Sequence, residues 1–120
     1  MSTLDRAAEL KSRTKAFAIH VVRLYRSLPR STDAQVLGKQ LLRSGTSVAA
    51  NYRAACRSRS KAEFISKMSV VLEEADETAF WLELLTETNT IQAERTQSIL
   101  KETNELAAIF GASIRTAKTS

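Results

Sequence analysis

Apolar side chains recur at every third or fourth residue along four stretches of this chain, and this spacing restricts the possible folds more than any other feature. It places those side chains on one face of an α-helix. Proline occurs once and glycine three times, so few residues interrupt the pattern. The four predicted apolar faces are Leu10, Phe17, Val21, Leu24 and Leu28; Leu37, Leu41, Ser44, Val48, Tyr52 and Ala55; Met68, Leu72, Ala75, Ala79 and Leu82; and Ile99, Leu106, Ile109 or Phe110, and Ile114.

Breaking and capping residues divide the four helices from one another. Pro29 ends the first, because the residue before a proline is disfavoured in the α region. Ser, Thr or Asn followed three residues later by Glu or Gln is typical of a helix start. The pairs with this spacing are Thr32 with Gln35, Ser60 with Glu63, and Asn89 with Gln92.

We therefore expect helices over residues 4–28, 33–57, 61–87 and 91–115, followed by a frayed polar tail. Helices of similar length with short connections pack antiparallel to their neighbours in sequence. The predicted fold is all-α, an antiparallel up-down-up-down four-helix bundle that occupies residues 1–120 as a single domain.

Composition excludes several classes of protein. Cys56 is the single cysteine, so no internal disulfide can form, and it lacks the Cys and His neighbours of a zinc site. No run approaches the roughly 20 apolar residues that cross a bilayer. We expect a cytoplasmic protein that has no membrane contact, no cofactor and no metal.

Two segments carry a family resemblance. Residues 40–55 read QLLRSGTSVAANYRAA, and residues 63–82 contain EFISKM, EEADET and FWL. The chain resembles the four-helix-bundle proteins encoded in intervening sequences of 23S rRNA genes, which are related to accessory proteins of diversity-generating retroelements. The resemblance implies a homopentamer with a role involving RNA or DNA, and no catalysis. Ala54 departs from the family, which often has Glu after the Tyr-Arg pair.

Charge is distributed unevenly along the chain. Residues 1–62 contain 13 Lys and Arg and three acids, a net charge of +10, whereas residues 63–120 have a net charge of −5. At about 100° per residue, one stripe of the second helix, opposite its apolar face, gathers four cations: Lys39, Arg43, Arg53 and Arg57. Small residues between the two basic pairs form a predicted saddle for close approach: Gly45, Thr46 and Ala50.

Three interpretations of this basic stripe stay open. Arginine binds phosphate bidentately, which favours nucleic acid. An acidic helix of a neighbouring subunit would fit as well, and the third helix offers an opposing interface in Glu74, Glu77 and Trp81. A plainly solvated face is the third interpretation.

The sequence favours a non-enzymatic assembly module with a basic surface for nucleic acid. One alternative is a helical ribonuclease, because Arg13 and His20 have the Arg-x4–6-His spacing of HEPN-type nucleases. A second alternative is a protein–protein adaptor that binds no nucleic acid, working through an unidentified protein partner.

Overall fold

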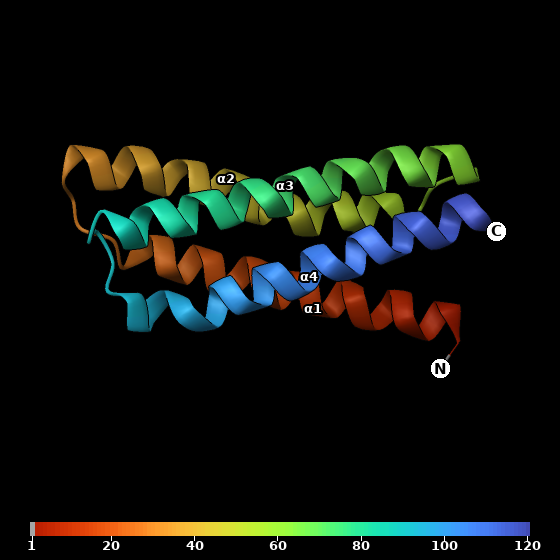
Figure 1. The fold of residues 1–120 in the computed structure, drawn as a ribbon, viewed down its shortest axis with the longest axis horizontal. Coiled ribbons are helices and arrows are strands. Elements are labelled where there is room, and N and C mark those ends of the chain that lie inside the picture. The colour runs from red at the N-terminus through yellow and green to blue at the C-terminus, as the bar shows by residue number, and fades with distance from the viewer. Residues whose placement is uncertain (1) are drawn as a thin grey trace.

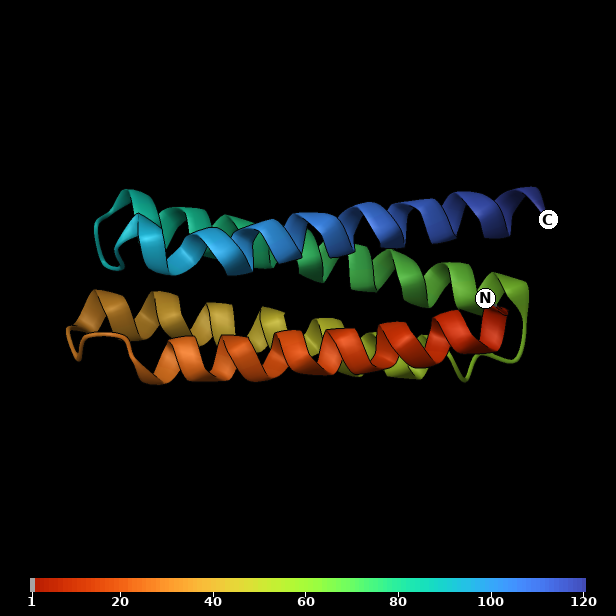
Figure 2. The same ribbon diagram turned by 90° about the horizontal axis from the view of Figure 1, so that it is seen from below.

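The computed structural model describes residues 2–120 and contains four α-helices (Figure 1). They are α1 (Thr3–Arg26), α2 (Thr32–Ala55), α3 (Lys61–Glu87) and α4 (Ala93–Thr119). Successive helices run in opposite directions, and Figure 2 shows α1 and α2 in one layer and α3 and α4 in the other. The predicted all-α four-helix bundle is confirmed.

Of the three predicted capping pairs, the structure confirms a side-chain cap at one, Ser60 with Glu63. The hydroxyl of Ser60 accepts a hydrogen bond from the Glu63 N–H at 3.0 Å. Neither α2 nor α4 has a side-chain cap, so the other two pairs were wrong. Gln35 instead donates its amide to the Pro29 carbonyl at 2.9 Å, which ties the α1–α2 connection to the second helix. Asn89, with a φ of 59°, takes the left-handed conformation that follows the end of α3.

Several helix ends differ from the expected bounds, and α2 ends at Ala55 rather than at residue 57. α1 ends at Arg26, and Ser27 caps it through its N–H and hydroxyl, yet Leu28 beyond the end remains buried. α4 begins at Ala93 and continues to Thr119, so the prediction of a frayed tail was wrong. The Thr119 hydroxyl bonds back to the Arg115 carbonyl at 3.2 Å, and Lys61 at the start of α3 donates to the Ser120 carbonyl. These contacts support the last turn.

One apolar core runs the length of the bundle between the two layers. Most of the predicted apolar positions are buried, and Phe110 rather than Ile109 fills the core in α4. The face of α3 is rotated from its predicted position, because Val71, Thr78 and Leu85 are buried and Leu72 and Ala79 are only half-buried. The rotation turns Thr78 toward α2, where its hydroxyl donates to the Ser44 hydroxyl at 3.0 Å.

Candidate nucleic-acid and subunit interfaces

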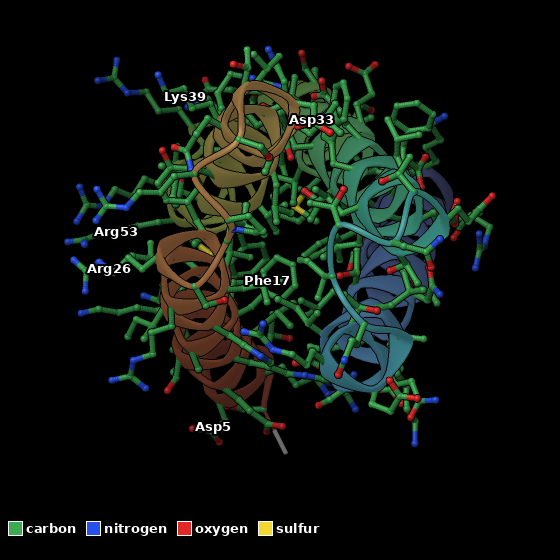
Figure 3. All side chains as sticks on the ribbon, turned by 90° about the vertical axis from the view of Figure 1, so that its left-hand side faces the viewer. Asp5, Phe17, Arg26, Asp33, Lys39 and Arg53 are labelled. Carbon is green, nitrogen blue, oxygen red and sulfur yellow. The ribbon has the colours of Figure 1, made fainter. Side chains whose placement is uncertain are left out.

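The outer side of the α1–α2 layer carries a concentration of cations. Figure 3 shows Lys39 and Arg53 of α2 and Arg26 of α1 projecting from the same side of the bundle. Helical position adds Lys11 and Lys15 from α1 and places Arg57 just beyond α2. All of them are exposed, and none pairs with a carboxylate in residues 2–120. We call Lys11, Lys15, Arg26, Lys39, Arg53 and Arg57 the basic face.

Acidic residues of the same two helices lie away from the basic face. Asp5 lies in the first turn of α1 and Asp33 in the first turn of α2, and both are directed elsewhere in Figure 3. Glu9 falls on the α4 side of α1 by its helical position. The basic face therefore presents positive charge without local neutralisation.

Arg43 belongs to the predicted stripe but behaves differently from Lys39, Arg53 and Arg57. Its guanidinium nitrogens donate to the two carboxylate oxygens of Glu74 at 2.9 and 3.2 Å, and one of them also binds Glu77. The structure thus pairs within one chain residues that the sequence placed on opposite sides of a subunit contact. The reason is that α2 and α3 are neighbours and both groups lie at their shared outer edge.

This ion-pair cluster changes the acidity of Glu77. Hydrogen bonding with Glu74, followed by the hydrogen bond from Arg43 and the nearby Trp81 indole, holds the pKa of Glu77 below its usual range. The indole N–H of Trp81 is covered and has no partner of good hydrogen-bond geometry in residues 2–120, although it lies near Glu77. Arg43 is therefore neutralised within the chain, and the excess carboxylate leaves the cluster negatively charged.

The predicted saddle is only partly on the surface. Gly45 is buried, and a Cβ at this position would lie 2.7 Å from both Cγ atoms of Val21 on α1. The close approach expected at Gly45 is made by α1 of the same chain and not at the outer surface, because Gly45 lies on the α1 side of the apolar face of α2. Thr46 is half-buried and its hydroxyl donates to the Leu42 carbonyl at 2.7 Å, while Ala50 is exposed.

An exposed aromatic residue on α3 escaped the sequence analysis. Trp81, the expected anchor, is half-buried, whereas its neighbour Phe80 is 53% exposed. The two rings meet edge to face, with centroids 4.9 Å apart and planes at 73°. The position of Phe80 nearly opposite the apolar face of α3 was the signal that could have identified it.

The Arg13–His20 pair lies beside α4. Arg13 donates to both oxygens of Glu102 at 2.8 and 2.6 Å and to Glu105 at 2.9 Å. Arg13 holds the pKa of Glu102 below its usual range, first by its hydrogen bond and then by its charge. His20 is exposed and lines a hollow with Ser98 and Lys101. A guanidinium held by two carboxylates is poorly placed to bind phosphate, which weakens the ribonuclease interpretation.

Residues 2–120 contain no group of three or more His, Cys, Asp or Glu that could hold a metal ion. Across the same residues, no helix is long and apolar enough to cross a membrane. Cys56 is a free, half-buried thiol. Tyr52 stacks on Phe110 with centroids 5.9 Å apart, and burial, then a hydrogen bond with Cys56, raises its pKa.

Comparison with known proteins agrees with the class that the fold defines, an antiparallel four-helix bundle. The match to the 23S rRNA-intervening sequence protein family extends over residues 6–112, and the chain belongs to that family. A similar crystal structure is that of a protein of unknown function from the S23 ribosomal protein family of Bacteroides thetaiotaomicron, with 40% identity and a TM-score of 0.81. The likeness covers 87% of this chain and 96% of that one. No curated protein matches.

Proposed function

We propose that the protein is a non-enzymatic, oligomeric four-helix bundle that binds the phosphate backbone of RNA or DNA through its basic face. The observation that carries this proposal is the concentration of unpaired cations on the outer side of the α1–α2 layer. Sequence-independent affinity for nucleic acid comes from such contacts with phosphate. A cytoplasmic location stays a prediction.

The extent of the basic face suits a polyanion better than a single anion. Lys39 and Arg53 are 14 residues apart on α2, which corresponds to about 21 Å along the helix. One strand of duplex DNA carries a phosphate about every 3.4 Å of axis. The basic face therefore matches several phosphates in a row. The basic face as described consists of Lys and Arg and includes no aromatic side chain to stack on bases, so we expect little sequence preference.

Assembly is the second part of the proposal. Repetition of the basic face around a homopentamer, which the family resemblance implies, would multiply weak phosphate contacts. Cations are concentrated on the α1–α2 layer, whereas α3 is rich in carboxylates. Copies can therefore associate through surfaces other than the basic face, which keeps its cations available for phosphate. Nucleic-acid binding and assembly are separable in this proposal.

Fluorescence anisotropy with labelled RNA and DNA of mixed sequence tests the binding. We expect log affinity to fall linearly with log salt concentration, and Lys39→Glu with Arg53→Glu to lower affinity at least tenfold. Arg115→Glu with Lys118→Glu, both on α4, changes the net charge by the same amount and should have a much smaller effect. Salt-independent binding, or equal losses in both variants, would contradict the proposal. Binding to neither polymer would favour the adaptor interpretation.

A further inference from the structure

Phe80 is the one exposed aromatic side chain in residues 2–120. Its ring rests edge to face on Trp81, which restricts its orientation. Four carboxylates occupy the neighbouring positions on the same side of α3, at three, four or seven residues from Phe80. They are Glu73, Asp76, Glu83 and Glu87, all exposed and free of ion pairs in the described chain. We call Phe80 with these four residues the acidic knob.

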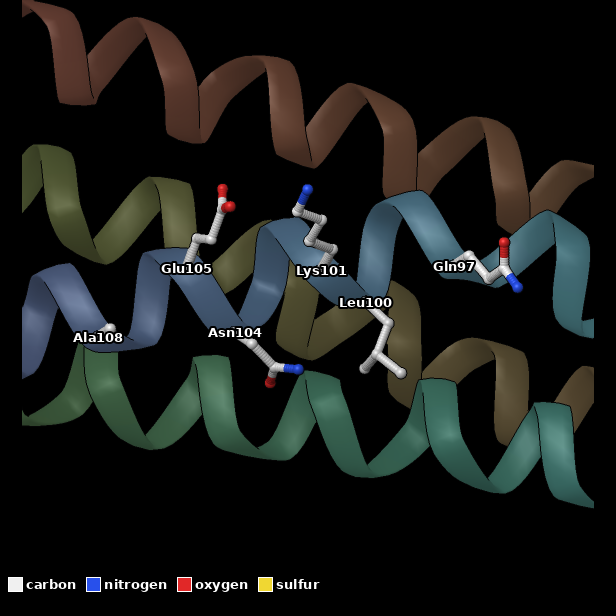
Figure 4. A pocket seen from close by; sticks show the side chains of 6 residues that line it. All are labelled: Gln97, Leu100, Lys101, Asn104, Glu105 and Ala108. Carbon is white, nitrogen blue, oxygen red and sulfur yellow. The ribbon is translucent and has the colours of Figure 1, made fainter.

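A shallow, largely apolar hollow of about 550 Å³ lies on the outer side of α4 (Figure 4). Leu100, Asn104 and Ala108 line it, together with Gln97, Lys101 and Glu105 at its edges. The hollow is open to solvent, so a phenyl ring from outside can rest on its apolar surface at Leu100 and Ala108. Lys101 is exposed and forms no ion pair in residues 2–120, whereas Glu105 is already bound to Arg13.

Knob and hollow lie at the same height along the bundle. The hydroxyls of Thr86 on α3 and Thr96 on α4 are 2.8 Å apart, and the two helices are antiparallel. Phe80 lies six residues before Thr86. Glu102 lies six residues after Thr96, in the middle of the segment that lines the hollow. A rotation about an axis parallel to the helices preserves height. Such a rotation can therefore bring the knob of one copy onto the hollow of another.

We propose that Phe80 of one copy inserts into the α4 hollow of a second copy, with Lys101 of that copy facing the carboxylates of the acidic knob. The contact is heterologous, because knob and hollow lie on different corners of the bundle. A heterologous contact of this kind repeats from copy to copy and closes a ring when the rotation between copies allows it.

This arrangement leaves the basic face free. Figure 2 shows the α1–α2 layer on the opposite side of the molecule from α3 and α4, so a ring built through the latter presents α1 and α2 outward. The inference rests on the oligomeric part of the proposed function and is independent of nucleic-acid binding. The sequence had placed the acidic side of the interface at Glu74, Glu77 and Trp81. In this arrangement the acidic knob, whose carboxylates form no ion pair in the described chain, takes that role.

Light scattering after gel filtration, with folding checked by circular dichroism, tests the contact. We expect wild type at several times the 13.3 kDa of one chain. Phe80→Arg should give a single chain, and so should Ala108→Glu, which fills the hollow and repels the knob. Ala50→Glu makes the same substitution on the α1–α2 layer and should retain the wild-type mass. Both altered positions in the contact are exposed, so folding should be intact.

Mixing the two monomeric variants distinguishes this contact from any other. Phe80→Arg retains an intact hollow and Ala108→Glu an intact knob, so an equimolar mixture should form a species of two chains and no larger one. A mixture that remains single chains overturns the proposal. If wild type is oligomeric and Phe80→Arg retains its mass, the contact is wrong while assembly stands. Even a weak complex with a dissociation constant in the micromolar range forms at about 50 µM. If wild type is a single chain at that concentration, the oligomeric part of the proposed function fails too.

Discussion

Gly45 of α2 lies directly against Val21 of α1, at a distance that leaves no room for a side chain. Gly45→Ala would place its methyl group 2.7 Å from both Cγ atoms of Val21. Overpacking costs about 1–3 kcal/mol, and the gain in helix propensity returns about 1 kcal/mol. We expect a net loss of up to about 2 kcal/mol in the free energy of unfolding, measured with urea.

Gly111→Ala is the control for that loss. A Cβ on Gly111 meets only the guanidinium of Arg115, at 3.4 Å, so the propensity gain of up to about 1 kcal/mol should dominate. Val21→Ala introduced together with Gly45→Ala should recover part of the loss. A stabilising Gly45→Ala would show that α1 and α2 are farther apart than described.

The buried hydroxyls of Ser44 and Thr78 set the contact between α2 and α3. Thr78→Val removes this bond while preserving shape, and we expect a loss of about 1 kcal/mol. Because each single change removes the same Ser44–Thr78 bond, Ser44→Ala together with Thr78→Val should cost less than the sum of the single changes. Chemical denaturation of all four proteins measures the coupling, and strictly additive losses would contradict it.

Ser60 and Ser31 provide a matched comparison of helix caps. Only Ser60 accepts a hydrogen bond from its helix, through the Glu63 N–H. Ser60→Ala should therefore lower the free energy of unfolding by about 1 kcal/mol, and Ser31→Ala by clearly less. Thermal unfolding followed by circular dichroism ranks the two variants, and equal losses would argue against the cap at Ser60.

The Arg13–Glu102 ion pair predicts a dependence of stability on pH. The pKa of Glu102 in the folded chain is lowered from its ordinary 4.5, chiefly by the hydrogen bond from Arg13. A lowered folded-state pKa stabilises the fold above the unfolded value, and that stabilisation is lost as pH falls through the folded value. The difference in unfolding free energy between wild type and Arg13→Gln should therefore shrink below pH 4.5. Lys11→Gln, which removes an unpaired charge, should show no such trend.

Arg43 and Arg53 should contribute unequally to nucleic-acid binding. Arg43 is already paired with Glu74 and Glu77, whereas Arg53 has no ion-pair partner in residues 2–120. Each phosphate contact contributes about 0.9 to the slope of log affinity against log salt for duplex DNA. Arg53→Gln should lower that slope by about this amount, and Arg43→Gln should leave it nearly unchanged. The reverse ranking would show that the Arg43 cluster opens to bind phosphate.

The sequence by itself determined the four helices, most of the core and the separation of charge. These features depend on local spacing: Val21 and Leu24 lie on one face of α1 whatever surrounds them, and Pro29 ends a helix through its own backbone. The exposure of Lys39 and Arg53 followed from their position opposite Leu41 and Val48. The same local reasoning failed at the ends of helices, where Gln35 bonds to Pro29 and the tail after residue 115 remains helical.

The tertiary structure alone decided which helix each side chain meets. Residues on either edge of an apolar face look alike in sequence, yet Gly45 turns to α1 and Ser44 to α3. Arg43 pairs with Glu74, at a distance of 31 residues along the chain, and Arg13 pairs with Glu102, at a distance of 89 residues. Helical periodicity gives the angle of a side chain about its own axis and carries no information about the neighbouring helix. The packing of all four helices decides whether a charge is compensated or free, which is why Arg43 is neutralised and Arg53 is available.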